Sequence, residues 1–243
     1  MTQFLLPELS VFYPCYNEEK NIQKTVDKTI PVLKKIAQKW EIILINDGSK
    51  DNTGKVLDQI KKQYSKEDIK IITHNPNRGY GGALKSGLYN AKYQWIVFTD
   101  SDGQFDFSEI TNLIKKQQET KADLVAGYYI ARQVSKMAIF TSKIWELIIY
   151  ILFGLHVTDI DCAFKLINKK IIDTIPELES KNGAFISSEF LIKTKRAGFK
   201  IVEIGVHHYP RIEGKATGRK LKVIINSFSD LFKFWFKTNF HRA

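Results

Sequence analysis

Two carboxylates one residue apart, Asp100 and Asp102, follow the apolar run Trp95–Thr99. Two acids so close repel each other unless a proton or a cation lies between them. Oxygen ligands at the carboxyl end of a buried strand suit Mg²⁺ or Mn²⁺, which can share its coordination with phosphate oxygens. The sequence Asp100-Ser101-Asp102 therefore predicts a divalent-metal site that faces a diphosphate. The alternative is a solvated turn, because Asp and Ser are common turn residues.

A second motif, from Pro14 to Glu18, directly follows another apolar run. Pro14 ends the predicted strand, Tyr16 offers a flat face to a base, and Glu18 can accept hydrogen bonds from a base or ribose edge. The alternative is that Asn17 and Glu18 only cap the helix that follows. The motif therefore predicts either a nucleotide contact or a helix start.

Two further motifs lie where a predicted strand passes into a helix. In the segment 46–53, Asp47 is placed to bind ribose hydroxyls or base nitrogens, whereas Gly48 and Asp51 are typical of a turn and a helix cap. The segment 77–83 is rich in glycine and precedes a helix. It lacks the P-loop and dinucleotide-binding patterns, so we favour close loop packing over a phosphate cradle.

Alternating strand and helix patterns position these motifs. Short β-branched or aromatic runs predict strands at Leu9–Tyr13, Glu41–Ile45, Ile69–Thr73, Trp95–Thr99 and Asp123–Ala126. Amphipathic stretches predict helices at Glu19–Lys39 (broken or kinked at Pro31), Asn52–Tyr64, Gly82–Ala91 and Phe107–Thr120. Later elements are predicted at Lys136–Phe153 (helix), near Phe164–Ile167 (strand), at Ser187–Ala197 (helix), at Lys200–Val206 (strand) and from about Leu221 (helix). The alternation predicts an α/β fold with a mainly parallel sheet that binds ligands at the carboxyl ends of its strands.

Taken in order, the motifs resemble those of the inverting GT-A glycosyltransferases, and within them the polyprenyl-phosphate sugar transferases typified by dolichol-phosphate mannose synthase. The resemblance covers nearly the whole chain, and it implies a GT-A catalytic domain over residues 1–210, with a twisted sheet flanked by helices. The motifs are Pro14-x-Tyr16-Asn17-Glu18, Asn46-Asp47-Gly48-Ser49-x-Asp51-x-Thr53, Asn77-x-Gly79 with Ala83 and Gly87, Asp100-Ser101-Asp102-Gly103-Gln104, Asp159-x-x-Cys162-Ala163-Phe164-Lys165, and Pro210-Arg211-x-x-Gly214.

The resemblance also implies roles for single residues. The residues placed against the donor are Pro14, Tyr16, Glu18, Asp47, Asp100, Ser101, Asp102 and Gln104, and the metal ligands among them are Asp100, Asp102 and Gln104. Arg211 and Lys215 would close over a donor or acceptor phosphate on a mobile loop. Related sequences often carry arginine where this chain has Tyr128 and Tyr129, which leaves Arg132, Lys136 and Lys143 as candidates for the acceptor phosphate.

Asp159 matches an aspartate of the family, and two roles are open for it. A hydroxyl acceptor would need a general base, and Asp159 or Asp161 could serve. A lipid phosphate has a second pKa of roughly 6 and would need none, in which case Asp159 fixes the geometry of its loop. The catalytic candidates are therefore Asp100, Asp102, Asp159 and Arg211.

Composition limits the possible partners. The 243 residues are 44% hydrophobic and carry a net charge of +11, an excess that attracts phosphates of a nucleotide, a nucleic acid or an anionic membrane. A nucleic acid is the poorer fit, because no recognised binding motif occurs and an Asp-x-Asp cleft repels a phosphate backbone. The two cysteines are too few for a disulfide framework, which favours the reducing cytosol.

The segment 211–243 predicts a basic loop followed by an amphipathic helix. It holds eight Lys and Arg residues against two Asp and Glu residues, and its apolar side chains recur at helical spacing from Leu221 to Phe236. The helix either lies on a membrane surface or packs on the catalytic core. With no signal peptide and no apolar run of about 20 residues, we expect peripheral binding at the cytoplasmic face of the membrane, or docking through a membrane-protein partner.

The leading hypothesis is transfer of a hexose from a GDP- or UDP-linked donor to a polyprenyl phosphate, with inversion and with Mg²⁺ or Mn²⁺. One alternative is a glycosyltransferase that extends a saccharide acceptor. The other is a basic protein that binds a membrane without catalysis.

Overall fold

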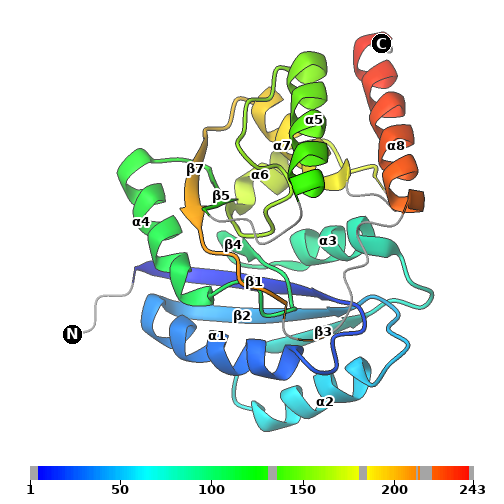
Figure 1. Ribbon diagram of the computed structural model, residues 1–243. Coiled ribbons are helices and arrows are strands. Elements are labelled where there is room, and N and C mark those ends of the chain that lie inside the picture. Colours follow the sequence, from blue (N-terminus) through cyan, green and yellow to red (C-terminus); the bar gives the residue numbers. More distant parts are fainter. Residues whose placement is uncertain (1–4, 131–135, 181–184, 212, 214–220, 241–243) are drawn as a thin grey trace.

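The computed structural model describes residues 5–130, 136–180, 185–211, 213 and 221–240. These residues form a seven-stranded sheet with helices on both faces (Figure 1). The strands are β1 (Leu6–Cys15), β2 (Ala37–Asn46), β3 (Ile69–Thr73), β4 (Trp95–Phe98), β5 (Leu124–Tyr129), β6 (Lys165–Asn168) and β7 (Ile201–Val206). The helices are α1 (Ile22–Ile36), α2 (Thr53–Gln63), α3 (Gly79–Asn90), the 3₁₀ turn η1 (Phe107–Glu109), α4 (Ile110–Thr120), α5 (Lys136–Phe153), α6 (Lys169–Thr174), α7 (Phe185–Arg196) and α8 (Leu221–Phe240).

The strands lie in the order β3-β2-β1-β4-β6-β5-β7. Strands β1 to β4 are parallel to one another, and β5 is parallel to β7. Strand β6 runs antiparallel to both of its neighbours, β4 and β5. The predicted α/β fold with a mainly parallel sheet is confirmed. The reversed strand in its middle was not predicted, because a short apolar run carries no sign of its direction.

The carboxyl ends of the first strands lie side by side. Cys15 at the end of β1 pairs with Asn46 at the end of β2, and Asn46 pairs in turn with Thr73 at the end of β3. On the other side of β1, strand β4 ends at Phe98. Because β6 is reversed, its first residue, Lys165, lies opposite Phe98 at this same edge. The segments that follow β1 to β4 and the segment that precedes β6 are therefore brought together.

The boundary between α1 and β2 differs from the prediction of one helix over Glu19–Lys39. Helix α1 continues through Pro31 and ends at Ile36, and β2 begins at the next residue, Ala37. Ala37 pairs with Leu6 at the start of β1, so the strand pairing extends further toward the amino terminus than the apolar pattern indicated. Pairing with β1 therefore overrides the helical pattern of the last predicted turn.

Two apolar cores lie on the two faces of the sheet. Val11 and Phe12 are neighbours on β1 but belong to different cores, because side chains alternate along a strand. Helices α1, α2 and α4 cover the first core, and α3 and α5 to α8 cover the second (Figure 1). Gly87 lets α3 approach the sheet, since a Cβ atom there would lie 2.1 Å from the ring of Phe12. Within the glycine-rich segment 77–83 itself, a Cβ atom on Gly82 would lie 2.5 Å from Cβ of Arg78. The choice between close loop packing and a phosphate cradle for that segment stays a prediction.

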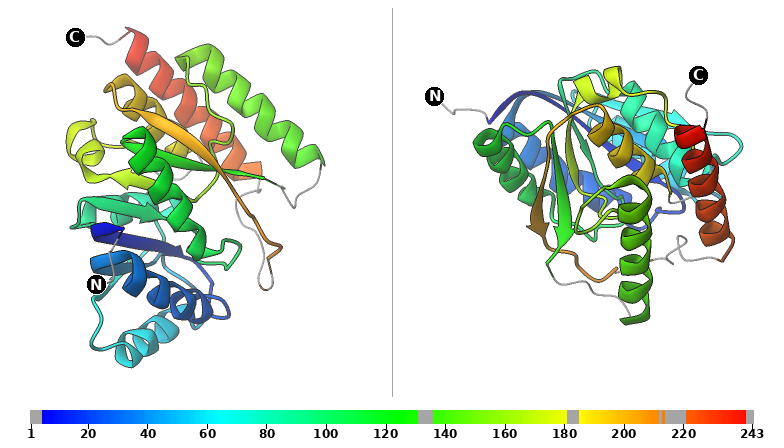
Figure 2. Two further views of the ribbon diagram at one scale, coloured as in Figure 1. Left: turned by 90° about the vertical axis from the view of Figure 1, so that its left-hand side faces the viewer. Right: turned by 90° about the horizontal axis from the view of Figure 1, so that it is seen from above.

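Helix α8 packs beside α5 (Figure 2). The rings of Trp145 and Phe228 are 5.2 Å apart, and those of Phe153 and Phe234 are 5.6 Å apart. Leu231 is completely buried in the second core. One face of α8 therefore packs on the rest of the protein, as one of the two interpretations predicted, and its other face is exposed. The division into domains 1–210 and 211–243 stays a prediction.

Candidate active site

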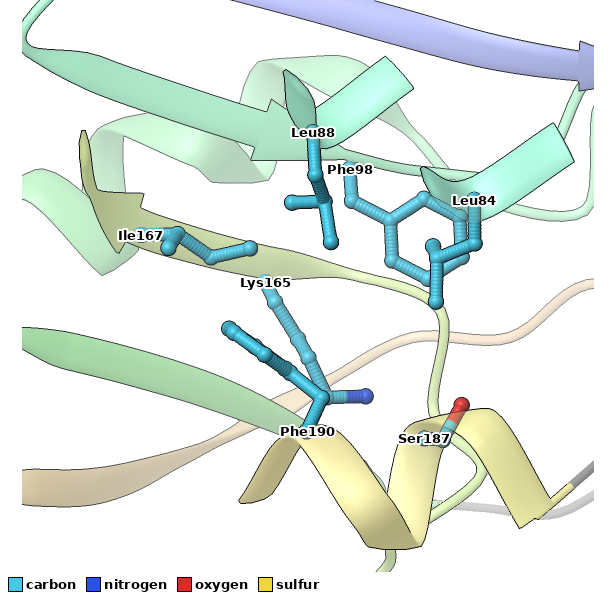
Figure 3. A pocket seen from close by; sticks show the side chains of 7 residues that line it. All are labelled: Leu84, Leu88, Phe98, Lys165, Ile167, Ser187 and Phe190. Carbon is cyan, nitrogen blue, oxygen red and sulfur yellow. The ribbon is translucent and has the colours of Figure 1, made fainter. Parts of the chain in front are cut away.

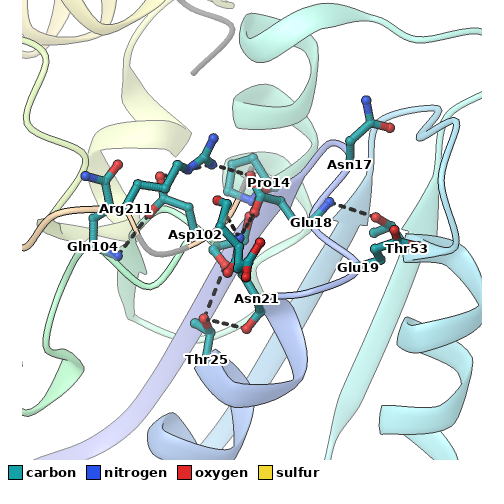
Figure 4. A network of polar contacts seen from close by, with 12 residues as sticks. Pro14, Asn17, Glu18, Glu19, Asn21, Thr25, Thr53, Asp102, Gln104 and Arg211 are labelled. Carbon is teal, nitrogen blue, oxygen red and sulfur yellow. Dashed lines mark hydrogen bonds and ion pairs between the residues drawn. The ribbon is translucent and has the colours of Figure 1, made fainter. Parts of the chain in front are cut away.

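Acidic side chains and one guanidinium meet at the carboxyl edge of the sheet. Glu18 follows β1, Asp100 and Asp102 follow β4, and Arg211 follows β7. Figure 4 shows Glu18, Asp102 and Arg211 pointing toward one another. Nη2 of Arg211 lies 3.2 Å from Oδ2 of Asp102 and also contacts Oε1 of Glu18. The structure thus brings together residues that were predicted from three separate motifs.

Short loops hold Asp102 in place. Oγ of Ser101 donates to the carbonyl of Pro14 at 2.6 Å and ties the end of β4 to the end of β1. Gly103 has a φ of 76°, a conformation that favours glycine. This turn lets N of Gln104 donate to Oδ1 of Asp102 at 3.0 Å. One carboxylate oxygen of Asp102 therefore faces its own loop, and the other faces the cluster.

The cluster carries more negative than positive charge. Loss of solvent raises the pKa of Asp100 to about 7, and the charge of Asp102 is the second cause. Loss of solvent also raises the pKa of Glu18. Arg211 opposes both shifts without cancelling them. A divalent cation beside the two aspartates would relieve this repulsion.

The aspartate pair fits Mg²⁺ or Mn²⁺. Mg²⁺ is usually held by one or two carboxylates together with substrate phosphates and water. Gln104, the third predicted ligand, donates from Nε2 to the carbonyl of Tyr209 at 2.9 Å, which leaves Oε1 as its ligand atom. Among the described residues, no three His, Cys, Asp or Glu side chains gather into a metal site. Asp100 and Asp102 stay the two carboxylates predicted to hold the metal, and the third carboxylate of the cluster, Glu18, contacts Arg211.

Asp47 lies at the end of β2, next to β1. Its N donates to the carbonyl of Cys15 at 2.9 Å, and the residue is buried. Oδ1 lies 2.6 Å from Nδ1 of His74, and Oδ2 accepts a hydrogen bond from Nδ2 of Asn77 at 2.8 Å. Asp47, which was predicted to contact the nucleotide, therefore also holds the loop after β3 in place. The sequence reasoning missed His74, whose only signal is its place directly after a predicted strand.

The loop after β1 is joined to the loop after β2. Asn17 has a φ of 59°, and its Oδ1 accepts from N of Lys50 at 2.8 Å. Helix α1 begins only at Ile22, so the capping interpretation is wrong for Asn17. Tyr16, one predicted base contact, is half-buried in this loop. Pro14, the other, is half-buried within β1, where it pairs with Ile45. The prediction that Pro14 ends the strand is therefore wrong, because β1 continues to Cys15.

Asp159 belongs to the loop that leads into β6. Its Oδ1 accepts a hydrogen bond from N of Asp161 at 3.2 Å. The buried Lys165 donates from Nζ to the carbonyls of Ile160, at 3.2 Å, and Cys162. These bonds fix the course of the loop, which agrees with the geometric role considered for Asp159. Its alternative role as a general base stays a prediction.

The predicted acceptor-phosphate residues are described only in part. Arg211 lies in the cluster, at 3.2 Å from Asp102. Arg132 and Lys215 lie outside the described residues. The backbone of Lys136 begins α5, but its side chain also lies outside the described part of the chain. The role of these three residues stays a prediction.

A small cavity lies between α3, α7 and β6 (Figure 3). Its volume of about 10 Å³ matches roughly one water molecule, so a sugar nucleotide cannot bind in it. The lining residues are Leu84, Leu88, Phe98, Lys165, Ile167, Ser187 and Phe190.

Comparison with known proteins identifies the family. The model of glycosyl transferase family 2 matches residues 10–175. This range includes the first five of the six motifs, the fifth of which ends at Lys165, the first residue of β6. The dolichyl-phosphate beta-glucosyltransferase of Saccharomyces cerevisiae is 32% identical over 241 residues, covering 90% of this chain and 70% of the yeast protein. The Homo sapiens protein of the same name is 27% identical over 224 residues, covering 85% of this chain and 68% of the human one.

Solved structures share the fold. Glucosyl-3-phosphoglycerate synthase from Mycobacterium tuberculosis, in complex with Mn²⁺, uridine-diphosphate-glucose and phosphoglyceric acid, matches with a TM-score of 0.72 and 17% identity. The match covers 94% of this chain and 80% of the mycobacterial one, and it confirms the predicted GT-A fold. Fold, motifs and relatives agree: the chain belongs to glycosyl transferase family 2, is related to the polyprenyl-phosphate sugar transferases, and is a glycosyltransferase.

Proposed function

We propose that this glycosyltransferase transfers one hexose from a nucleotide-sugar to a polyprenyl phosphate, with inversion and with Mg²⁺ or Mn²⁺. The observation that supports this most is the pairing of Arg211 with Glu18 and Asp102, close enough to Asp100 to act on it by charge, at the edge where parallel sheets bind ligands. The names of the yeast and human relatives support a dolichyl-type phosphate acceptor and make glucose the first sugar to test. Both UDP and GDP are open as the nucleotide.

The donor would lie across the ends of β1, β2 and β4. Tyr16 and Pro14 would face the base, and Asp47 with Glu18 would accept hydrogen bonds from the nucleoside. Asp100 and Asp102 would hold the metal near the diphosphate, with Ser101 fixing their loop against Pro14. When bound, the metal would stabilise the negative charge that develops on the leaving diphosphate.

Arg211 would assist the leaving group and the acceptor. Its guanidinium is a planar fork that suits phosphate oxygens, and it already lies beside Asp102 and Glu18. Lys215, Arg132 and Lys136 are the further cations that we propose for the acceptor phosphate. In the reaction, an acceptor phosphate oxygen forms a bond to the anomeric carbon while the bond from that carbon to the diphosphate breaks. No proton has to leave an ionised acceptor, so Asp159 is needed only to shape its loop.

The membrane-facing surface would include α5. Its row Met137, Phe140, Ile144, Leu147 and Ile151 recurs every three or four residues, and each of these side chains is at least 41% exposed. Apolar residues at this spacing form one stripe along a helix, which suits contact with the interfacial region of a bilayer. On α8, the exposed Phe232 and Phe236 lie beside Lys233 and Lys237.

We infer peripheral binding at the cytoplasmic face, where anionic lipids would attract the net charge of +11. Within the described residues, every helix is too short or too polar to span a bilayer. A membrane-protein partner is an additional possibility for docking.

The test is incubation of the purified protein with Mg²⁺ or Mn²⁺, a short polyprenyl phosphate and a panel of UDP- and GDP-linked hexoses. Mass spectrometry should detect one glycosylated lipid phosphate with one donor, and EDTA or Asp102→Asn should abolish it. Asp58→Asn is the matched control. Asp58 is exposed on α2, so this substitution makes the same change of charge away from the site. Product from a saccharide acceptor, and none from the lipid phosphate, would reject the proposed acceptor.

A further inference from the structure

His74 is a buried histidine that bridges three elements at the carboxyl edge of the sheet. It follows β3 and is 2% exposed. Nδ1 lies 2.6 Å from Oδ1 of Asp47, at the end of β2, and Nε2 lies 2.8 Å from Oγ of Ser86, on α3. The contacts therefore link β2, β3 and α3 through one imidazole ring.

The hydrogen-bonding inventory fixes the direction of the contact between His74 and Asp47. An ionised carboxylate only accepts hydrogen bonds, so Nδ1 of His74 carries the proton that is donated to Asp47. A neutral imidazole then accepts the hydroxyl proton of Ser86 at Nε2. In the neutral ring, the hydrogen bond that Nδ1 donates to Asp47 thus determines that Nε2 carries no proton.

The Asp47 carboxylate is held from several directions. Oδ1 also accepts from N of Arg78 at 2.8 Å, and Oδ2 accepts from Nδ2 of Asn77 at 2.8 Å. A carboxylate has about four acceptor positions, and the three bonds leave one on Oδ2. The N of Asp47 donates to the carbonyl of Cys15, so the backbone of Asp47 lies next to the segment 14–16 that holds the predicted base contacts Pro14 and Tyr16.

The set Ser86, His74 and Asp47 has the order of contacts of a hydrolytic triad, but its setting does not suit acyl transfer. Ser86 lies inside α3, which extends from Gly79 to Asn90. Backbone N–H groups in a helix interior are used by the helix itself, so they cannot form an oxyanion hole beside Ser86. The set is better explained by what it does to Asp47.

We propose that His74 is a positioning residue for donor recognition: it fixes the Asp47 carboxylate so that the remaining acceptor position on Oδ2 receives an N–H or O–H of the donor's nucleoside. This inference rests on the proposed use of a nucleotide-sugar. It assigns His74 to the nucleoside and not to the diphosphate, the metal or the acceptor. A substitution at His74 that removes the hydrogen bond to Asp47 should therefore weaken nucleotide binding and leave binding of the metal and of pyrophosphate unchanged.

Two substitutions at His74 test its contacts with Asp47 and with Ser86 separately. The amide nitrogen of Asn lies near the place of Nδ1, so His74→Asn can still donate to Asp47. The amide of Gln reaches the place of Nε2, so His74→Gln keeps the contact with Ser86 and loses the one with Asp47. We expect His74→Asn to keep nucleoside diphosphate affinity within about threefold, and His74→Gln to lose about tenfold, the effect of one lost hydrogen bond to a charged group.

The experiment is calorimetry with Mn²⁺ and three ligands, UDP, GDP and inorganic pyrophosphate, on the wild type, both His74 variants and Ser86→Ala. Support for the proposal is a loss for the preferred nucleotide in His74→Gln, with pyrophosphate and Mn²⁺ affinities as in the wild type and with Ser86→Ala close to wild type. An equal loss for nucleotide and pyrophosphate would show a general distortion of the site and overturn it. Unchanged nucleotide affinity in His74→Gln would also overturn it.

The outcomes separate this inference from the proposed function. If the wild type binds a nucleotide and the His74 variants behave as expected, but no glycosylated lipid forms, the acceptor is wrong and the role of His74 stands. If the lipid product forms and His74→Gln binds the nucleotide normally, the role of His74 is wrong and the proposed function stands. If the wild type binds neither UDP nor GDP, both are rejected.

Discussion

Nη2 of Arg211 lies 3.2 Å from Oδ2 of Asp102, the carboxylate proposed to hold the metal. The same nitrogen contacts Glu18, which is proposed to bind the nucleoside. The guanidinium therefore occupies a position that the proposed donor and metal would also need. If they bind as proposed, we expect Arg211 to move from the carboxylates to the phosphates.

This competition predicts opposite effects of Arg211→Gln on metal binding and on turnover. Removal of a positive charge beside Asp102 should raise Mn²⁺ affinity about threefold to tenfold, a range that allows for solvent screening. Turnover should fall about 100-fold, because a cation that stabilises the leaving group is lost. Calorimetry with MnCl₂ and the lipid product assay measure the two effects. Lys62→Gln on α2 is the control of equal charge, and unchanged Mn²⁺ affinity in Arg211→Gln would contradict the competition.

The raised pKa of Asp100 predicts that metal binding depends on pH. With a pKa of about 7, this carboxyl is mostly protonated at pH 6 and mostly ionised at pH 8 in the metal-free protein. Since a metal ligand has to be ionised, Mn²⁺ affinity should fall by about tenfold from pH 8 to pH 6 and binding should release a proton. Calorimetry in buffers of different ionisation enthalpy counts that proton. The same affinity at both pH values would contradict this account.

The same shift has a consequence for stability, and its sign is fixed. The pKa of Asp100 is higher in the folded protein than its ordinary value of 3.8, so the folded state binds this proton more tightly than the unfolded state. Its contribution is therefore fully present below about pH 4 and is lost as the pH rises through about 7. Thermal unfolding of the metal-free protein should show Tm falling from pH 5 to pH 8, and Asp100→Asn should flatten that slope. An equal slope in both proteins would assign it to other groups.

The exposed row on α5 predicts the membrane-binding face. In Phe140→Glu with Ile151→Glu, two exposed side chains that would enter the bilayer become charged. Binding to vesicles that contain anionic lipid should weaken by more than tenfold, because burial of each original side chain contributes roughly 1.5–3 kcal/mol. Co-sedimentation measures the effect. The control is Gln59→Glu with Asn112→Glu, which adds the same charge on the exposed surfaces of α2 and α4, and an equal loss in both would indicate charge alone.

A buried ion pair predicts how α7 is held in the second core. Glu189 is 1% exposed, lies 2.7 Å from Nζ of Lys193, and accepts hydrogen bonds from N of Glu179 and of Ser180. Glu189→Ala should cost about 3–5 kcal/mol of unfolding free energy, because the buried lysine loses its nearer charge partner and keeps only the exposed Glu179, at 3.6 Å. The N–H groups of Glu179 and Ser180 also lose their acceptor. Urea unfolding measures the loss. In Glu189→Leu with Lys193→Met both charges are replaced, so this double variant should be more stable than Glu189→Ala, and the reverse order would contradict the pairing.

The sequence was sufficient for what depends on local patterns. Each apolar run that predicts a strand forms one, and the polar residues directly after those runs, such as Glu18, Asp47 and Asp102, lie at one edge because the strands are parallel. Contacts between distant residues could not be predicted in the same way. Arg211 is 109 positions from Asp102, and nothing in either motif indicates that the segment after β7 reaches the loop after β4, although β6 and β5 separate the two strands in the sheet. His74 has no motif of its own, and its role depends on the meeting of β2, β3 and α3.

Chain order and sheet order differ at β6, and this difference bears on how the molecule assembles. Strands β1 to β4 are contiguous in sequence and form four adjacent positions of the sheet, so the proposed nucleotide half can take shape from residues 6–98. When β5 is synthesised, it has no partner strand in the growing sheet. It joins the sheet only after β6 has been synthesised and has inserted between β4 and β5. Such non-local pairing is slow. During synthesis, the half that carries Arg211 and the proposed lipid face should therefore join last, and a chain that ends before Lys165 would leave the sheet open at β4.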